Sequence, residues 1–322
     1  MYTMSSELGR LTPRIKRKEV TVMDDQAERL RNIIKRQQYQ PDIPQKMSRV
    51  ITVTSGKGGV GKTSVSVNLA ISLARLGKKV VILDADFGLA NIEIMLGIRP
   101  QYNLADLMFR GKGMRDIITY GPENIGFISG GSGINEMANL NKTQIVDLIQ
   151  KMAELDQLAD IVIVDTGAGI GNSVLEFVAA SEEVLLVATP EPTSITDAYA
   201  LLKSLNRNSS YQKTQTVVEL IANQIRGTSD AAELHEKLGI VVNKFLNIDI
   251  DFLGAIPYDD NMSKAILRQV PVVLSAPESK AAKSIMEIAA KLGRTELPQE
   301  EQGFGIMRLF SSVIRMKFGR NK

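Results

Sequence analysis

The stretch Ser55-Gly56-Lys57-Gly58-Gly59-Val60-Gly61-Lys62-Thr63 decides the fold of this chain. It follows a β-branched run at residues 50–54, which predicts a strand, and precedes residues 64–76, whose apolar side chains recur at helical spacing. The interval from Gly56 to Thr63 has the spacing G-x-x-x-x-G-K-[ST] of a phosphate-binding loop, whose backbone amides point at polyphosphate oxygens. The dipole of the following helix adds positive potential at the same place. The sequence therefore predicts a nucleotide site formed by Gly56, Lys57, Gly58, Gly59, Val60, Gly61, Lys62, Thr63 and Ser64.

Two side chains at the end of this loop suit a nucleoside triphosphate. Lys62 can place a point charge between β- and γ-phosphate oxygens, and the hydroxyl of Thr63 can bind Mg²⁺. The alternative is a glycine-rich turn with two incidental lysines, which the flanking strand and helix disfavour. We therefore expect Mg²⁺ with the nucleotide, and Lys62 as a catalytic residue.

Lys57 makes the pattern more specific, because a general phosphate-binding loop does not require a charge there. Residues 56–63 resemble the deviant Walker A motif of the MinD/ParA-type ATPases, of the SIMIBI class. The resemblance implies that ATP and ADP are the ligands and that ATP bridges a homodimer. It also implies that Lys57 is catalytic in trans, on the ATP of the partner protomer. A solvated loop lysine is the alternative.

Acidic residues follow two apolar runs that predict buried strands. Asp84 and Asp86 come after residues 79–83, and Asp165 comes after residues 161–164. Ligands bind at the carboxyl ends of strands in open parallel sheets. By the same resemblance, Asp86 orients the attacking water, Asp84 lies near the Mg²⁺ shell and Asp165 is the Walker B carboxylate. Gly167 stands where MinD and ParA proteins usually have proline, a departure in keeping with the FlhG branch.

Further strands are predicted at residues 184–188, 217–222 and 252–256, alternating with helical segments. This alternation predicts an α/β fold, with a mainly parallel, doubly wound sheet flanked by helices. Asn223, Pro257 and Tyr258 follow two of these strands and match positions that contact adenine in the resembling family. Turn chemistry at strand ends explains Asn223 and Pro257 equally well.

Composition sets limits on the class of protein. The chain has no cysteine, which excludes disulfides, cysteine-ligated metals and the iron–sulfur relatives of this ATPase class. A net charge of +3 is too small to argue for nucleic acid, so no specific nucleic acid is expected. The single histidine, His235, lies between glutamates in a polar helical segment, and we expect it to be solvated rather than catalytic.

Residues 1–22 show no signal peptide and predict a disordered extension, after which Met23 could be the functional start. Residues 23–37 predict a short amphipathic helix, and residues 38–49 a linker. Residues 25–31 resemble the DQAxxLR element of FlhG proteins, also called YlxH or FleN. The resemblance implies that this helix stimulates the GTPase FlhF. We expect Gln26 to act in the partner's site and Leu30 and Ile33 to anchor the helix.

At the other end, residues 297–302 predict a linker, and residues 303–322 an amphipathic helix too short to cross a bilayer. Its apolar face and cationic polar face suit anionic lipid. The alternative is a terminal helix that packs on its own core. The expected membrane residues are Ile306, Met307, Phe310, Val313 and Ile314.

Together these expectations describe a MinD-like ATPase domain at residues 50–296 with an activator helix before it and a membrane helix after it. The resemblance implies control of flagellar number and placement, with flagellar basal-body components as further partners. It also implies a cytoplasmic protein that binds reversibly to the inner face of the cytoplasmic membrane. A septum- or chromosome-positioning ATPase is the alternative within the enzyme class. An interaction module that holds nucleotide only as a structural ligand is the alternative outside it.

Overall fold

The computed structural model describes residues 47–86, 91–131, 142–208, 211, 215–227, 229–294 and 305–319. The predicted activator helix at residues 23–37, with Gln26, Leu30 and Ile33, lies outside these ranges. So do the linker at residues 297–302 and most of the linker at residues 38–49.

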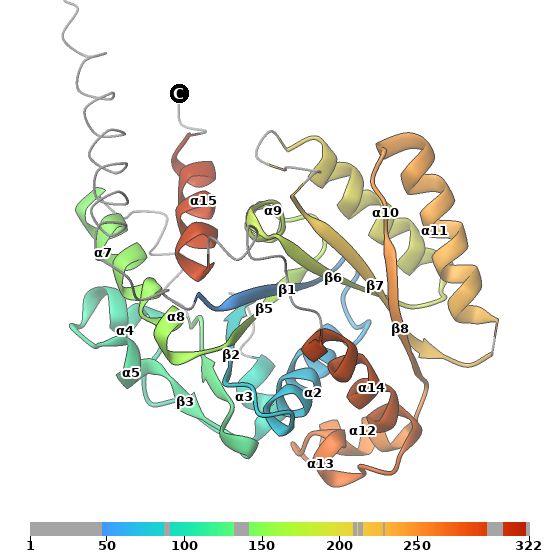
Figure 1. Cartoon of the computed structure of the whole chain (residues 1–322), viewed down its shortest axis with the longest axis horizontal. Helices are drawn as coiled ribbons and strands as arrows, with labels where there is room; N and C mark the ends of the chain where they lie inside the picture. The colour runs from blue at the N-terminus through green and yellow to red at the C-terminus, as the bar shows by residue number, and fades with distance from the viewer. Residues whose placement is uncertain are drawn as a thin grey trace, which may run out of the picture. The chain divides into compact units, whose positions relative to one another are not determined.

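An eight-stranded sheet forms the centre of the described chain (Figure 1). The strand order is β3-β4-β2-β5-β1-β6-β7-β8, and every neighbouring pair is parallel except β3 with β4. This confirms the predicted fold class. Strand β3 has two residues, too few for a period-2 pattern to reveal it. The strands are β1 (Arg49–Ser55), β2 (Val80–Ala85), β3 (Thr119–Tyr120), β4 (Gly126–Ile128), β5 (Ile161–Ala168), β6 (Glu183–Ala188), β7 (Val217–Ile225) and β8 (Asp251–Pro257).

Helices cover both faces of the sheet, as expected for a parallel sheet whose strands are apolar on both sides. One face carries α2 (Lys62–Arg75), α3 (Asn91–Leu96), α12 (Asp260–Leu267), α13 (Val272–Ser275) and α14 (Lys280–Arg294). Over β4, β2 and β5, the other face carries α4 (Leu104–Phe109), α5 (Met114–Ile117), α7 (Lys142–Ala153), α8 (Leu155–Leu158) and α15 (Gly305–Gly319). Over β6 and β7 it carries α9 (Asn172–Ala180), α10 (Pro192–Asn206) and α11 (Asp230–Leu246).

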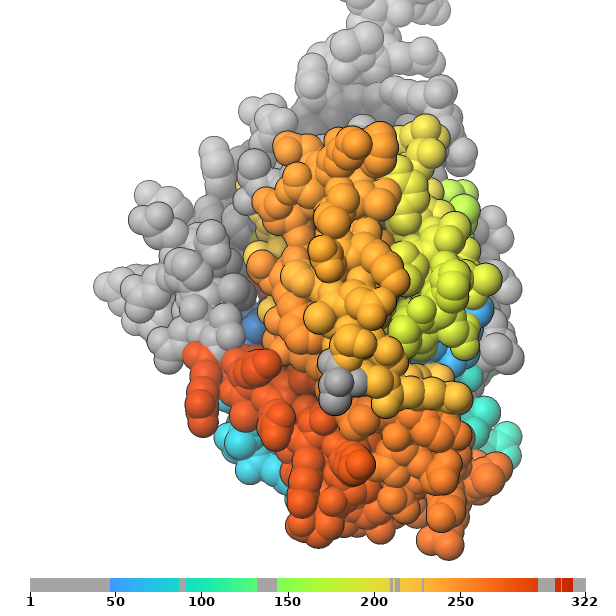
Figure 2. Space-filling model, turned by 90° about the vertical axis from the view of Figure 1, so that its right-hand side faces the viewer, coloured from blue at the N-terminus to red at the C-terminus, as the bar shows by residue number. Residues whose placement is uncertain are grey.

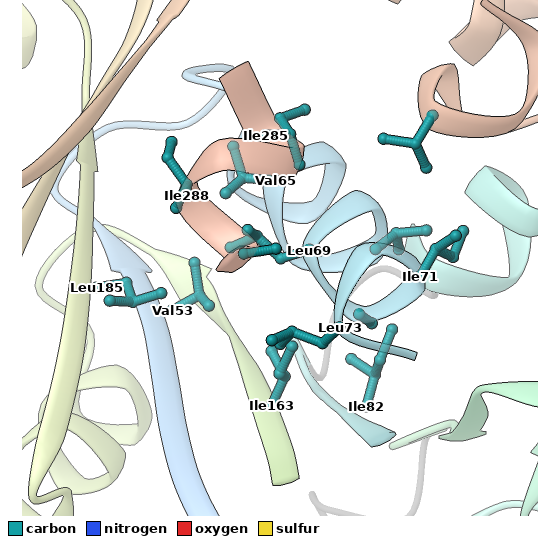
Figure 3. Packing of buried hydrophobic residues seen from close by; sticks show 14 of the residues in the cluster. Val53, Val65, Leu69, Ile71, Leu73, Ile82, Ile163, Leu185, Ile285 and Ile288 are labelled. Carbon is teal, nitrogen blue, oxygen red and sulfur yellow. The ribbon is translucent and has the colours of Figure 1, made fainter. Parts of the chain in front are cut away.

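The helix after the phosphate-binding loop packs into the middle of the first face. Leu69 of α2 is fully buried among Val53, Ile163 and Ile288, side chains that Figure 3 shows close together. Helix α2 ends at Arg75, and Gly77 follows with a φ of +83°, as the glycine there predicts. This packing fixes the start of α2 against the carboxyl end of β1, where the nucleotide site is expected.

Strand β8 is at one edge of the sheet, on the side of the molecule that faces the viewer in Figure 2. Lys291 Nζ of α14 donates to the carbonyl oxygen of Leu253 at 2.7 Å. His235 Nε2 of α11 lies 2.8 Å from the carbonyl oxygen of Ile250, and its ring packs beside Phe252. His235 is half-buried and one of its ring nitrogens contacts the backbone, so its side chain is less solvated than expected. The contact from Lys291 occupies one backbone acceptor of the edge strand, which is then not free to pair with another strand.

The C-terminal helix α15 packs on its own core in this structure. Ile306, Phe310, Val313 and Ile314 are each less than 8% exposed, and Met307 is partly buried in the same cluster. The ring of Phe310 meets Phe177 of α9 edge to face, with centroids 6.0 Å apart. All five residues expected to enter a membrane thus contact protein here, as in the alternative of a docked helix. No helix within the described ranges is both long enough and apolar enough to cross a membrane.

Candidate nucleotide site

The phosphate-binding loop joins β1 to α2, as predicted. Gly59 and Gly61 have φ angles of +80° and +91°, which L side chains rarely adopt. Gly56 is required for a different reason: a Cβ there would lie 2.2 Å from the backbone of Asp197 in α10. Helix α10 therefore presses directly on the loop, and the loop conformation depends on having no side chain at this contact.

Asp165, fully buried in the second half of β5, binds the start of α2 through both oxygens. Its Oδ1 accepts from Ser66 Oγ at 2.9 Å and lies 3.3 Å from Lys62 Nζ, while its Oδ2 accepts from Thr63 Oγ1 at 2.7 Å. Lys62 is itself buried. The predicted Walker B acid, catalytic lysine and metal-binding threonine are thus in direct contact.

Asp84 lies next to Asp165, because β2 and β5 are paired with these two residues in register. It is 2% exposed and accepts the backbone N–H of Asp86 at 3.1 Å. Burial, and then the charge of Asp165, raises the pKa of the Asp84 carboxyl to about 7. A cation bound beside the two carboxylates would favour the charged form of Asp84.

Asp86 lies at the boundary of the described residues, after β2. Its Oδ2 accepts from Asn91 Nδ2 at 3.1 Å, and a Cβ on Gly167 would lie 3.4 Å from its Oδ1. The expected water-positioning carboxylate therefore lies beside Gly167, in the segment after Asp165.

Lys57 is bound within its own chain. Its Nζ donates to Glu191 Oε2 and to Thr193 Oγ1, both at 2.8 Å, at the start of α10. This contact lowers the pKa of the Glu191 carboxyl. Because both partners are substantially exposed, the pair is weak and Lys57 can leave it.

Asn223, Pro257 and Tyr258 come together at the carboxyl ends of β7 and β8. Asn223 is buried, and its Nδ2 donates to the carbonyl oxygen of Val60 at 2.7 Å, so it holds the phosphate-binding loop. Tyr258 is half exposed, with the guanidinium of Arg226 4.8 Å from its ring centre. The three predicted residues share one end of the sheet with the loop, and their contact with adenine remains a prediction.

Four residues of this neighbourhood were not predicted. Ser66 lies one helical turn after Lys62, a spacing that could have identified it. Glu191 and Thr193 follow β6, so the rule that ligands lie at the carboxyl ends of strands could have found them. The same rule could have found Arg226, which directly follows β7.

The oxygen atoms at the site form a donor set that suits Mg²⁺. A hydroxyl from Thr63 and carboxylates from Asp84 and Asp165 are hard ligands, and Mg²⁺ takes one or two carboxylates besides phosphate and water. No group of three or more histidine, cysteine or acidic side chains able to hold a metal occurs in the part of the chain that the structure describes. The site thus fits a cation that arrives with phosphates.

Known proteins are similar to this chain in sequence and in fold. A ParA family profile, described as NUBPL iron-transfer P-loop NTPase, matches residues 46–293. The antiactivator FleN of Pseudomonas aeruginosa is 43% identical over 255 residues, 79% of this chain and 90% of FleN. The flagellum site-determining protein YlxH of Helicobacter pylori is 31% identical over 302 residues, 91% of this chain and 99% of YlxH. The septum site-determining protein MinD of Pyrococcus horikoshii, complexed with Mg-ADP, matches with a TM-score of 0.60 at 26% identity, covering 77% of this chain and 97% of that one.

The match to FleN and YlxH extends over most of their length, and the match to MinD extends over nearly all of the MinD chain. Since the chain has no cysteine, the iron-transfer chemistry in the profile's description has no cysteine ligands here. Lys62 and Thr63, at the end of the phosphate-binding loop, both contact Asp165. The chain therefore belongs to the MinD/ParA family of nucleotide-binding P-loop ATPases, in the branch that contains FleN and YlxH/FlhG.

Proposed function

We propose that this protein is an ATPase that dimerises on ATP, associates reversibly with the membrane and controls the number and placement of flagella. The observation that carries the enzymatic part is the buried contact of Asp165 with Lys62, Thr63 and Ser66. The flagellar part is supported by the relatives named FleN and YlxH.

In this proposal each residue of the site has one task in ATP hydrolysis. The amides of residues 56–63 hold the phosphates, and Lys62 balances charge between the β- and γ-phosphates. Thr63, Asp84 and Asp165 hold Mg²⁺, which neutralises charge on the phosphate oxygens. Asp86 orients the attacking water, and Lys57 leaves Glu191 to reach the nucleotide of the partner protomer. Asn223, Pro257 and Tyr258 contact adenine.

Membrane association in this proposal requires α15 to leave the core. Exposing one large buried apolar side chain to water costs about 1.5–3 kcal/mol, so exposing five costs on the order of 10 kcal/mol. That cost disfavours a helix that waits free in water. The same side chains regain most of it in lipid, so we expect α15 to transfer directly from core to membrane.

Within the described residues, a series of contacts connects the surroundings of Asp86 to α15. Residues 167–171, beside Asp86, lead directly into α9, and Phe177 of α9 packs on Phe310 of α15. A shift of residues 167–171 on ATP binding would therefore disturb the packing of α15 on α9. This route supports release of the helix in the ATP-bound dimer.

As part of the flagellar role, we propose that residues 23–37 stimulate an FlhF-type GTPase and that basal-body components bind this protein. We also propose that the protein is located in the cytoplasm and reversibly at the inner face of the cytoplasmic membrane. Residues 25–31 match the DQAxxLR element of the FlhG branch to which the chain belongs.

Sedimentation and vesicle flotation with Mg-ATP test the enzymatic and membrane parts. Asp86→Ala should bind ATP and accumulate as a dimer with little turnover, whereas Lys57→Ala should bind ATP as a monomer. Ile314→Asp should reduce flotation on anionic vesicles to background while ATP binding persists, because a charge in lipid is costly. The matched control Ser312→Asp adds the same charge at a partly exposed position of α15 and should retain flotation.

An ATP-saturated monomer of Asp86→Ala would remove the role assigned to Asp86. Flotation of Ile314→Asp at the wild-type level would show that α15 is not the membrane element. Binding of the ATP dimer to DNA would favour a chromosome-positioning role instead, and no turnover in the presence of vesicles would favour a purely structural nucleotide.

A further inference from the structure

The start of α15 and the start of β1 share one hydrogen-bond acceptor, the carboxylate of Asp156 in α8. Asp156 Oδ1 accepts from the backbone N–H of Ile306 at 3.3 Å. The same oxygen accepts from the backbone N–H of Ser48 at 3.2 Å and from its hydroxyl at 2.5 Å. Two segments that are 258 positions apart in the sequence, 306 minus 48, thus meet at one atom.

Each of these contacts is built into its surroundings. Ile306 is the second residue of α15, so its N–H has no acceptor inside the helix, and a carboxylate at this end also favours the helix dipole. A Cβ on Gly305, whose φ is +43°, would lie 2.5 Å from Asp156 Oδ1. Position 305 therefore needs glycine both for its backbone angle and for the approach of the carboxylate.

Ser48 is buried and lies directly before β1, so it is the point where the segment before residue 47 joins the fold. Any displacement of that segment reaches Ser48 before it reaches the sheet. Ser48 and Ile306 bind the same oxygen, so moving one changes the position of the acceptor for the other. By linkage, the effect of one on the other must be reciprocal.

We propose that Asp156 is a clasp that joins the N-terminal segment to the C-terminal helix, so that release of α15 from the core and displacement of Ser48 promote each other. The clasp gives the two ends of the protein a direct connection that does not pass through the nucleotide site. A partner that pulls on the N-terminal segment would ease α15 off the core, and a membrane that takes α15 would loosen that segment. The inference rests on the proposed role of α15 as the membrane element.

Hydrogen exchange of the full-length protein without lipid tests the hold on α15. Asp156→Ala should speed exchange of amides at residues 306–314 about tenfold, within the usual range of such couplings, and leave α2 and β5 unchanged. Gly305→Ala, which changes the same contact on the α15 side, should also speed exchange at residues 306–314. Asp156→Asn keeps an acceptor oxygen and should have a smaller effect. The matched control is Glu154→Gln, which removes an exposed charge two residues away. If Asp156→Ala and Gly305→Ala both exchange like wild type at residues 306–314, Asp156 does not hold the helix.

Exchange of the wild type on vesicles of phosphatidylglycerol and phosphatidylcholine with Mg-ATP tests the coupling. As residues 306–314 change environment, amides at residues 48–50 should lose protection, and in Asp156→Ala they should be unprotected with or without vesicles. Unchanged protection at residues 48–50 while α15 leaves the core would overturn the clasp. A wild type that never binds vesicles would instead refute the proposed membrane role, and the lipid-free measurement would still decide whether Asp156 holds α15.

Discussion

The ammonium group of Lys62 lies 3.3 Å from Oδ1 of Asp165, and neither side chain is accessible to solvent by more than 7%. This pair sits between the strand that ends at the site and the helix that begins there. Thr63 and Ser66 donate to the same carboxylate, so Asp165 is surrounded by donors. The residues that bind phosphate and metal in the proposed reaction therefore also hold β5 to α2.

Removing the Asp165 carboxylate should destabilise the nucleotide-free protein as well as abolish turnover. Asp165→Ala leaves the Lys62 charge buried without its partner, a change that typically costs about 3–5 kcal/mol. We expect the Tm to fall by about 6–20 °C. Ser66→Ala removes a neutral hydroxyl that donates to Asp165 and to the carbonyl oxygen of Lys62, and it should lower the Tm by only about 2–4 °C. Thermal unfolding of both variants without nucleotide measures these Tm values. If Asp165→Ala and Ser66→Ala lower the Tm by the same amount, the buried pair is not stabilising.

Replacing Gly56 by alanine should disable the phosphate-binding loop. The new Cβ would overlap the backbone of Asp197, which cannot turn aside as a side chain can. Either the loop or α10 must shift, so we expect ATP affinity to fall by more than about tenfold with the fold retained. Gly239→Ala in α11 is the control, because a Cβ there meets nothing within 4 Å and the residue lies outside the phosphate-binding loop. Titration with a fluorescent ATP analogue measures both, and a Gly56→Ala protein with wild-type affinity would refute the contact.

The sequence predicted the sheet and the core of the site because both follow from strong local patterns. The sequence has a glycine-rich loop between a strand and a helix, and it has acids that end apolar runs. These patterns place Lys62, Asp84 and Asp165 at the side of the sheet where the parallel strands have their carboxyl ends. Chain topology then brings them into contact, as Asp84 and Asp165 in register on β2 and β5 show.

The packing of α15 and the contacts of Asn223 and Lys57 depend on segments that are distant in the sequence, and no local pattern specifies such contacts. The apolar face of α15 looks the same whether its partner is lipid or protein, and only the fold reveals Phe177 beneath Phe310. Asn223 could not be assigned from the sequence because its partner is a backbone carbonyl of Val60 on another element. The contacts of Lys57 with Glu191 and Thr193 were missed for the same reason.

Glu219 of β7 should make stability depend on pH. Burial, and then the charge of Glu183, raises its pKa to about 7, while the charge of Arg49 opposes this shift and Arg49 also forms an ion pair with Glu183. A carboxyl with a higher pKa in the folded state holds its proton more tightly there than in the unfolded state. Stability is therefore lost as the pH rises from the ordinary glutamate range through about 7, and it changes little above that.

Glu219→Gln should remove this loss. We expect its Tm to exceed that of wild type by about 2–6 °C at pH 8, and by much less at pH 5, where Glu219 is largely protonated. Glu236→Gln, at an exposed position of α11, serves as the control and should show no such trend. Thermal unfolding across this pH range measures the difference, and a gap that is constant with pH would show that Glu219 is charged throughout.

The predicted helix at residues 23–37 should stimulate GTP hydrolysis by an FlhF-type GTPase without the ATPase domain. It is a short amphipathic segment joined to the fold by a proline-containing linker, and a helix of this length is marginal alone, so its apolar face needs a partner. A synthetic peptide of residues 23–37 should then raise the GTP turnover of the purified partner. Single-turnover kinetics and peptide binding, measured together, separate the two roles assigned to the peptide.

Two substitutions in the peptide distinguish an active residue from an anchor. Gln26 carries an amide that both donates and accepts, which suits it to order a water or a side chain in the GTPase site. Gln26→Ala should therefore lower stimulation more than binding. Leu30→Asp places a charge on the anchoring face and should abolish both, because burying an unpaired charge is costly. If the peptide leaves GTP turnover at its basal rate while the full-length protein accelerates it, the stimulating surface belongs to the ATPase domain.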